Sequence, residues 1–250
     1  MSDVSTMEPA IPSEPSAASA SETADPELEA MFYAKVHIGY SRTRRHPKMK
    51  PYIFGLRNTV EIFDLERVRD KIREAEALAK AWGEKRAVVL WVATKPALRT
   101  IIEKAAGDLG MPYVTGRWAG GLLTNFSEIR KRLDYFEDLK AKRASGELAR
   151  YTKKEQLVFA DELMRLEQKF GGIVSLKKLP DAVIIVDPEE EITASREARS
   201  TGVLSVGIAN VDSNPELVNH VIPANDSAAS SVRYIIERLA AAYQAGTGTE

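Results

Sequence analysis

Apolar runs alternate with amphipathic stretches through the middle of the chain. Residues 87–93 and 182–186 are continuous apolar runs rich in β-branched side chains, a pattern typical of strands buried on both faces of a parallel sheet. Weaker apolar runs predict further strands at 112–115, 203–208 and 220–222. Helical periodicity separates these runs, at 65–82, 97–109, 192–200 and 227–243. We therefore predict an α/β fold with a doubly wound, flavodoxin- or Rossmann-like parallel sheet.

A long insertion interrupts this alternation. Apolar side chains follow a 4-3-4-3 spacing on both sides of a polar turn, and they are Leu122, Phe126, Ile129, Leu133 and Phe136, then Phe159, Leu163, Leu166 and Phe170. Thr152 and Glu155 have the spacing of a capping box at the start of the second helix. The pattern predicts an inserted antiparallel coiled-coil helical hairpin at 124–171, between sheet-domain segments at 61–123 and 172–243. Two ordinary surface helices lying on the core are the alternative.

The net charge of −1 conceals two segments of opposite sign. Residues 1–30 contain seven acids and no lysine or arginine, and they are rich in alanine, serine and proline, so we predict a disordered acidic N-terminal tail. Residues 31–60 contain seven cations and no acid. This asymmetry indicates a polyanionic partner, or an acidic tail that shields a basic surface. Residues 244–250 are predicted to form a loose C-terminus.

Composition argues against several classes of protein. The chain has no cysteine, which excludes disulfides, thiolate metal sites and cysteine nucleophiles and favours a reducing cytoplasm. The longest apolar run, residues 87–93, is too short to span a bilayer, and no N-terminal stretch combines positive charge with apolar character. His37, His46 and His220 fit no metal motif. We predict no membrane association, no metal and no cofactor.

An α/β enzyme or binding protein for a nucleotide or sugar phosphate is the alternative that such a sheet suggests. However, the turn at 94–96 lacks the glycines of a dinucleotide fingerprint. At 187–191, Asp187 is predicted to cap a helix that begins at Pro188, and four carboxylates there would repel a phosphate. Gly120 and Gly121, close to Arg117, are the one glycine turn that could admit an anion. We predict no catalytic residues and no small-molecule substrate.

Residues 31–60 carry the strongest functional signal. Between Arg42 and Tyr52, five cations lie within nine residues, and Pro47 and Pro51 are expected to hold the segment extended along a phosphate backbone. A solvated charged face is the alternative interpretation. The predicted RNA-binding cations are Lys35, Arg42, Arg44, Arg45, Lys48, Lys50, Arg57 and Arg117. A second set comprises Tyr40 and Tyr52, which could stack on bases, and the hairpin cations Lys131, Arg132, Lys153 and Lys154.

Ordered motifs along residues 31–243 resemble the bacterial small-subunit ribosomal protein two family. They are Val36–Gly39, Pro47–Gly55, Arg57–Asn58, Asp64–Leu65, Arg117–Gly121, Leu123–Phe126, Leu179–Asp181, Val186–Pro188, Ile222–Pro223 and Asn225–Asp226. Two positions depart from the family pattern. Tyr40 stands where histidine is common, which weakens any metal proposal near His37, and Ala119 replaces a bulkier apolar residue. The acidic tail is not a general family feature.

The resemblance implies a structural constituent of the small (30S) ribosomal subunit that catalyses nothing. It implies a parallel-sheet domain with an inserted coiled-coil arm, and binding to small-subunit ribosomal RNA between head and body. The implied protein partners are neighbouring small-subunit ribosomal proteins, including protein one, whose docking for messenger RNA capture in translation the family assists. The implied location is cytoplasmic and ribosome-associated.

Overall fold

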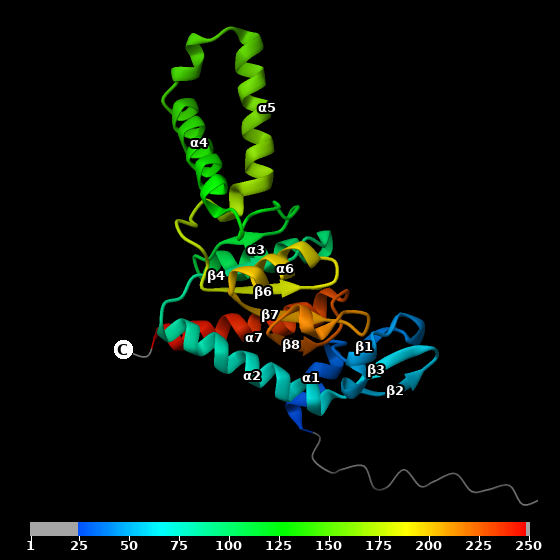
Figure 1. The fold of residues 1–250 in the computed structure, drawn as a ribbon. Helices are drawn as coiled ribbons and strands as arrows, with labels where there is room; N and C mark the ends of the chain where they lie inside the picture. Colours follow the sequence, from blue (N-terminus) through cyan, green and yellow to red (C-terminus); the bar gives the residue numbers. More distant parts are fainter. Residues whose placement is uncertain (1–24, 249–250) are drawn as a thin grey trace, which may run out of the picture.

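The computed structural model describes residues 25–248, so most of the predicted acidic tail lies outside the described residues. Its centre is a five-stranded parallel sheet in the order β5-β4-β6-β7-β8 (Figure 1). The strands are β4 (Val89–Val92), β5 (Tyr113–Val114), β6 (Ala182–Val186), β7 (Leu204–Ala209) and β8 (His220–Pro223). Renumbered within the sheet, this is the 2-1-3-4-5 order of flavodoxin-like folds. The predicted parallel sheet is confirmed.

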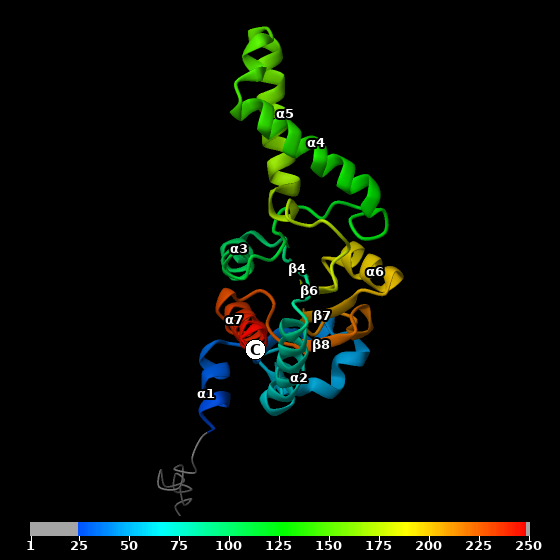
Figure 2. The same cartoon turned by 90° about the vertical axis from the view of Figure 1, so that its left-hand side faces the viewer.

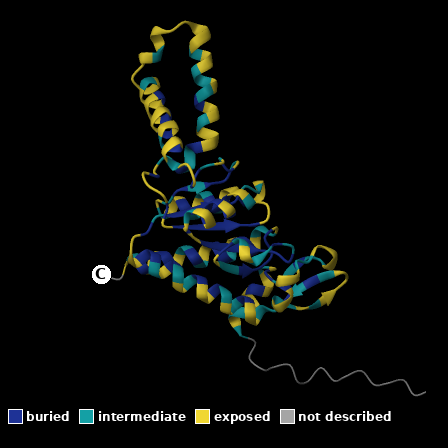
Figure 3. Ribbon diagram, viewed as in Figure 1, coloured by how far each residue is buried: buried dark blue, intermediate teal, exposed yellow. Residues whose placement is uncertain are grey.

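Alternation along each central strand distributes side chains to two cores. Trp91 and Ile184 belong to the larger core, whereas Leu90 and Val183 belong to the second. Helices α2 (Leu65–Glu84), α3 (Arg99–Asp108) and α7 (Ala229–Thr247) supply the larger core, and α6 (Ile192–Thr201) supplies the second. A short 3-10 turn, η3 (Pro96–Leu98), precedes α3. The sheet is therefore covered by helices on both faces, and Figure 3 shows most of its strand residues in the buried colour.

Residues 38–63 form a second, antiparallel sheet that the sequence pattern did not predict. Strands β1 (Ile38–Ser41), β2 (Ile53–Arg57) and β3 (Val60–Phe63) pair in the order β1-β3-β2. A tight turn with positive φ at Asn58 and Thr59 joins β2 to β3, as hairpin turns require. The expectation of an extended ribbon is wrong between Arg42 and Tyr52, because two 3-10 turns, η1 (Arg42–Arg44) and η2 (Pro47–Tyr52), occupy it. Pro47 begins η2 because its fixed φ suits a helical first position.

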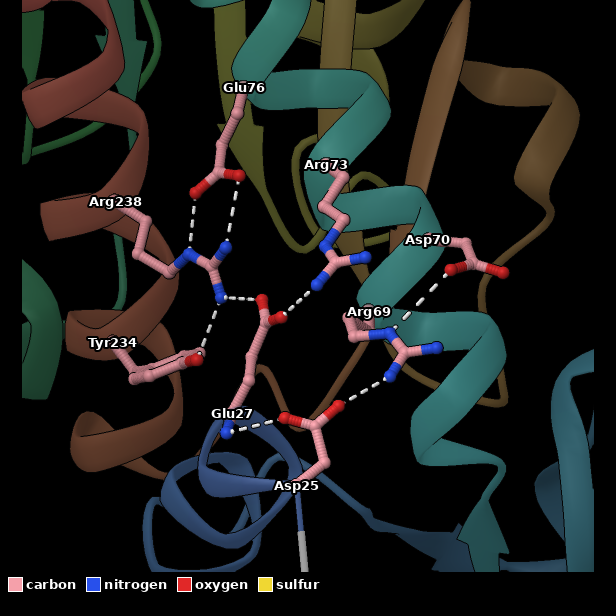
Figure 4. A network of polar contacts seen from close by, with 8 residues as sticks. All are labelled: Asp25, Glu27, Arg69, Asp70, Arg73, Glu76, Tyr234 and Arg238. Carbon is pink, nitrogen blue, oxygen red and sulfur yellow. Dashed lines mark hydrogen bonds and ion pairs between the residues drawn. The ribbon is translucent and has the colours of Figure 1, made fainter.

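The predicted disorder is also wrong at 25–30, where helix α1 (Pro26–Tyr33) begins with Asp25 as its N-cap. Acidic side chains of this segment bind cations of α2 and α7 (Figure 4). Asp25 accepts from Arg69 at 2.7 Å, and Glu27 pairs with both Arg73 and Arg238. These partners lie 44 to 211 residues away in the sequence, so local composition could not reveal them.

The C-terminal segment is helical through Thr247, so the expected loose end is wrong for residues 244–247. Gly83 of α2 and Gly246 of α7 meet where the two helices pack together. A Cβ at Gly246 would overlap the carbonyl oxygen of Lys80, so this close approach of two backbones requires glycine.

The insertion forms two helices, α4 (Phe126–Ala144) and α5 (Lys153–Phe170), which project from the sheet domain (Figures 1 and 2). A 3-10 turn, η4 (Glu147–Arg150), lies between them, and another, η5 (Gly171–Ile173), follows α5. The predicted capping box is present, since Thr152 and Glu155 exchange side-chain and backbone hydrogen bonds. The two helices share a small apolar cluster built on Phe136, Leu139 and Leu163. Leu122 lies before α4 and belongs to the second core of the sheet domain.

Candidate nucleic-acid interface

The basic segment builds the small antiparallel sheet and its turns, at one end of the molecule (Figure 1, blue to cyan). Intermediate and exposed residues predominate there (Figure 3). Within residues 25–248, the cations of this segment that are exposed and have no ion-paired carboxylate are Lys35, Arg42, Arg44, Lys50 and Arg57. Their charge is therefore available to an external anion.

Three of these cations gather at one end of the small sheet. The backbone N–H of Arg42 donates to the carbonyl of Thr59 in the β2–β3 turn at 3.1 Å, and Arg57 is paired with Val60 in the same hairpin. Arg44 lies two residues further along η1, with its guanidinium 5.5 Å from the centre of the Tyr40 ring. We call Arg42, Arg44 and Arg57 the tip cluster. Their backbones lie close together, and none of the three has an ion-paired carboxylate within residues 25–248, which favours a polyanion.

Two predicted RNA-binding cations already have acidic partners. Arg45 pairs at 2.9 Å with Glu61, whose side chain is only 2% exposed, so it neutralises a buried acid. Lys48 pairs with Glu216, but both side chains are at least half exposed, so water screens the pair and a phosphate can displace it. Arg45 thus has a buried acidic partner, whereas the partner of Lys48 is exposed.

The two predicted stacking tyrosines are half-buried. The Tyr40 hydroxyl hydrogen-bonds to Ser227, and the Tyr52 ring packs against the larger core. By contrast, Phe54 of β2 is 80% exposed and Leu56 is 51% exposed. Sequence reasoning passed over Phe54, since its exposure follows from a strand that was not recognised.

The remaining predicted cations are exposed but lie elsewhere. Arg117 lines a hollow of about 640 Å³ between the sheet domain and the base of α5. Arg99, Glu103 and Lys169 also line this hollow. On the projecting helices, Lys131 pairs with Glu128 at 2.6 Å, while Arg132, Lys153 and Lys154 have no ion-paired carboxylate among the described residues. The structure therefore does not join these cations with the tip cluster (Figure 1).

The glycine turn that could have held a phosphate is filled by Glu197 of α6. Its carboxylate accepts hydrogen bonds from the indole of Trp118 at 3.1 Å, from the backbone of Gly121 at 2.8 Å and from that of Leu123 at 3.0 Å. Both the backbone N–H and the hydroxyl of Thr124 donate to the same carboxylate. Burial alone would raise the pKa of Glu197, but these donors outweigh it and lower that pKa. A charged internal acid occupies the anion position.

Internal charged side chains also fill the crevice at the carboxyl ends of β4, β6 and β8. Lys95 lies between Asp187 and Asp226, with Nζ–O distances of 2.6 and 2.8 Å. Burial, reinforced by the charge of Asp226, raises the pKa of Asp187 to about 6 despite Lys95. Burial would also raise the pKa of Asp226, but hydrogen bonds from Lys95 and Asn210 lower it. The crevice where flavodoxin-like sheets bind ligands thus contains an internal ion triad.

The predicted role of Asp187 as the cap of a helix is wrong. Helix α6 begins at Ile192, and Asp187 instead accepts from the backbone of Glu190 in a preceding turn, with a positive φ of 59°. Glu191 is buried and accepts from Thr94, so the carboxylates do not all face a helix end as expected. One carboxylate oxygen of Asp187 accepts in that turn, and the other pairs with the ammonium of Lys95.

Within residues 25–248, no group of three metal-binding side chains is found. No helix in the same part of the chain is long and apolar enough to cross a membrane.

Comparison with known proteins covers nearly the whole described chain. The sequence pattern of the family described as ribosomal protein S2 matches residues 31–246. Small ribosomal subunit protein uS2 of Roseiflexus sp. (strain RS-1) is 40% identical over 216 residues, which are 85% of this chain and 81% of that protein. Its namesakes from Thermus thermophilus and Shewanella loihica are 38% and 37% identical, covering 84% and 89% of this chain and 82% and 92% of theirs. The chain therefore belongs to the ribosomal protein S2 family, whose members are structural ribosomal proteins and not enzymes.

Proposed function

We propose that this protein holds ribosomal RNA in the small ribosomal subunit through the exposed cations of its small antiparallel sheet. The observation that carries the proposal is the tip cluster, in which Arg42, Arg44 and Arg57 are exposed with no ion-paired carboxylate in the described chain. Each arginine presents a planar fork that grips phosphate oxygens in two places. Lys35 and Lys50 add charge on the same segment.

The proposed mechanism is electrostatic. Every phosphate neutralised by a lysine or arginine releases a bound counterion, so affinity falls as salt rises, with a log–log slope of about −0.7 to −0.9 per contact. Arg45 has a structural role. It balances the buried charge of Glu61 on β3 and so stabilises the small sheet that presents the other cations. We expect RNA binding to depend on the tip cluster and folding to depend on Arg45.

A filter-binding titration at several salt concentrations tests the proposal. The test variant carries Arg42→Ala, Arg44→Ala and Arg57→Ala together. The plot of log affinity against log salt concentration is expected to become less steep by about 2 to 3. The matched control removes three exposed lysines that lie on other elements, Lys80, Lys85 and Lys104. An unchanged slope in the tip-cluster variant, or an equal reduction in the control, would contradict the assignment.

The projecting helices are proposed as a second contact with RNA or with neighbouring ribosomal proteins, and their 4-3 spacing supports coiled-coil packing. Leu157, Val158 and Met164 of α5 are more than half exposed, which supports a partner on that face.

Family resemblance supports assistance in docking ribosomal protein one, a cytoplasmic location and the lack of a small-molecule substrate. Sedimentation of cell extract on a sucrose gradient tests assembly, because the protein is expected in the small-subunit peak.

A further inference from the structure

We propose that Phe54 is a stacking platform for an unpaired base of single-stranded RNA, an inference that rests on the RNA binding proposed above. Phe54 has the highest exposed fraction, 80%, among the large apolar side chains of the described chain. It lies on β2, which is an outer strand of the small sheet. Most of the ring surface is therefore open to a ligand and is not held in the core of the protein.

Cations line a hollow beside this ring. The hollow is shallow, with a volume of about 570 Å³, and its lining includes Phe54, Lys48, Lys50, Arg67 and Pro51. Lys50 has no ion-paired carboxylate in the described chain, and the partner of Lys48 is a solvent-exposed glutamate that a phosphate can displace. An anionic chain passing over the ring would therefore meet these two lysines beside it.

The one acid of the hollow is already engaged. Asp64 caps α2 by accepting from the backbone of Glu66 and of Arg67, and its second oxygen pairs with the Arg67 side chain at 3.3 Å. The charge of Arg67 offsets it, so the net positive charge of the hollow comes from Lys48 and Lys50. The hollow thus combines an apolar ring, a proline surface and unbalanced positive charge.

This combination fits single-stranded RNA better than the other polyanions. A duplex presents phosphates but keeps its bases stacked inside, so an exposed ring gains nothing from it. An unpaired base has a free π-face, and sheets that bind single strands place aromatic side chains on their strands for this purpose. An acidic protein would satisfy the lysines, but a flat open ring on a polar sheet offers it no deep pocket. An unpaired RNA base is therefore the ligand that fits Phe54 best.

The test measures binding of the full chain to two probes of equal length by fluorescence anisotropy: a 5′-labelled oligouridylate and a labelled RNA duplex. Phe54→Ala is expected to raise the Kd for the single strand about 5- to 150-fold, the range that loss of one stacked base gives. The Kd for the duplex and the salt slope for either probe are expected to stay unchanged. Tyr33→Ala, which removes a 73% exposed aromatic ring from α1, is the matched control.

A second variant gives a readout other than affinity. Phe54→Trp is expected to retain single-strand affinity, and its indole emission should be quenched when the oligouridylate binds. The native residues Trp82, Trp91 and Trp118 are all buried, so they contribute little to such quenching. Wild-type binding that Phe54→Ala does not weaken, or an unquenched indole, would overturn the stacking inference alone and leave the ring as a protein contact. Absence of binding by the wild-type chain to either probe would overturn the proposed function itself.

Discussion

Replacing Glu197 with alanine is expected to be among the most damaging single changes in the sheet domain. Its carboxylate is the only acceptor that the structure shows, within residues 25–248, for the side chain of Trp118 and the backbone N–H of Leu123. These two groups are buried, and Gly121 is half-buried. The N–H and hydroxyl of Thr124 are exposed enough for water to replace the carboxylate.

The magnitude follows from the donors left without an acceptor. Each buried donor that loses its partner costs about 1–3 kcal/mol, so the two buried donors and the half-buried one together cost roughly 3–6 kcal/mol. That is a large part of the ~5–15 kcal/mol that stabilises a typical native protein. For a chain of this length, the midpoint of thermal unfolding should fall by about 6–24 °C. Glu197→Gln should cost less, since one acceptor oxygen remains, although its amide would face donors.

Urea unfolding followed by circular dichroism measures this loss, and hydrogen exchange at the amide of Leu123 reports it locally. Glu189→Ala is the matched control, because Glu189 is an exposed glutamate just before the same helix, and it should change the free energy of unfolding by no more than about 0.5 kcal/mol. A loss below about 1 kcal/mol for Glu197→Ala would show that water replaces the carboxylate at this turn. The reasoning about a filled anion site would then be refuted.

The lowered pKa of Glu197 determines the pH range in which its carboxylate stabilises the fold. The pKa of Glu197 is lower in the folded protein than its ordinary value of 4.5. The unfolded chain therefore binds a proton first as pH falls, and the stabilisation from Glu197 is complete above about pH 4.5. It is lost as pH falls through the lowered folded-state pKa. The difference in stability between wild type and Glu197→Ala should be constant near neutral pH and should shrink only in acid.

Three further substitutions test other parts of the structure by urea unfolding. Lys95→Met should cost about 3–5 kcal/mol, because it leaves two buried carboxylates without their shared cation, and a loss below about 1 kcal/mol would contradict the ion triad. Gly246→Ala should cost about 1–3 kcal/mol because its methyl group overlaps the backbone of α2. Its control is Gly107→Ala, at a helical glycine with open space around it, which should instead stabilise by about 0.5–1 kcal/mol. Arg238→Ala should cost about 1–2 kcal/mol and make α1 more susceptible to chymotrypsin, and unchanged cleavage there would show that the ion pairs of Figure 4 do not hold this helix.

The central sheet could be predicted from sequence because burial on both faces imposes a simple pattern. Every residue of β6 is buried, so its five positions read as one apolar run, and the predicted bounds match the observed strand. The strands of the small sheet are short and partly exposed, and their sequence signal was dominated by charge. Ile38–Ser41 includes a glycine and two polar-tipped side chains, which alternate too weakly to indicate a strand.

The candidate interface was predictable as a segment but not in its detail. An acid-free stretch of 30 residues predicts a basic surface, and the structure shows five of its cations exposed without an ion-paired carboxylate in the described chain. The partner of Arg45 is Glu61, one residue beyond that stretch, on the strand β3 that pairs with β1, the strand preceding Arg45. Helix α1 illustrates the same limit, since acids that indicate disorder by composition are held by cations distant in sequence.

The positions of the carboxylates explain why an α/β sheet of this order can serve a structural function. In flavodoxin-like folds the crevice at the carboxyl ends of the strands binds a ligand. Here Lys95 joins two aspartates in that crevice, Thr94 donates to Glu191 beside it, and Glu197 takes the amides of the glycine turn. The groups at these positions are bonded inside the protein, so their contacts stabilise the fold. The tip cluster lies apart from them on the small antiparallel sheet, and the RNA binding proposed there need not compete with a ligand in this crevice.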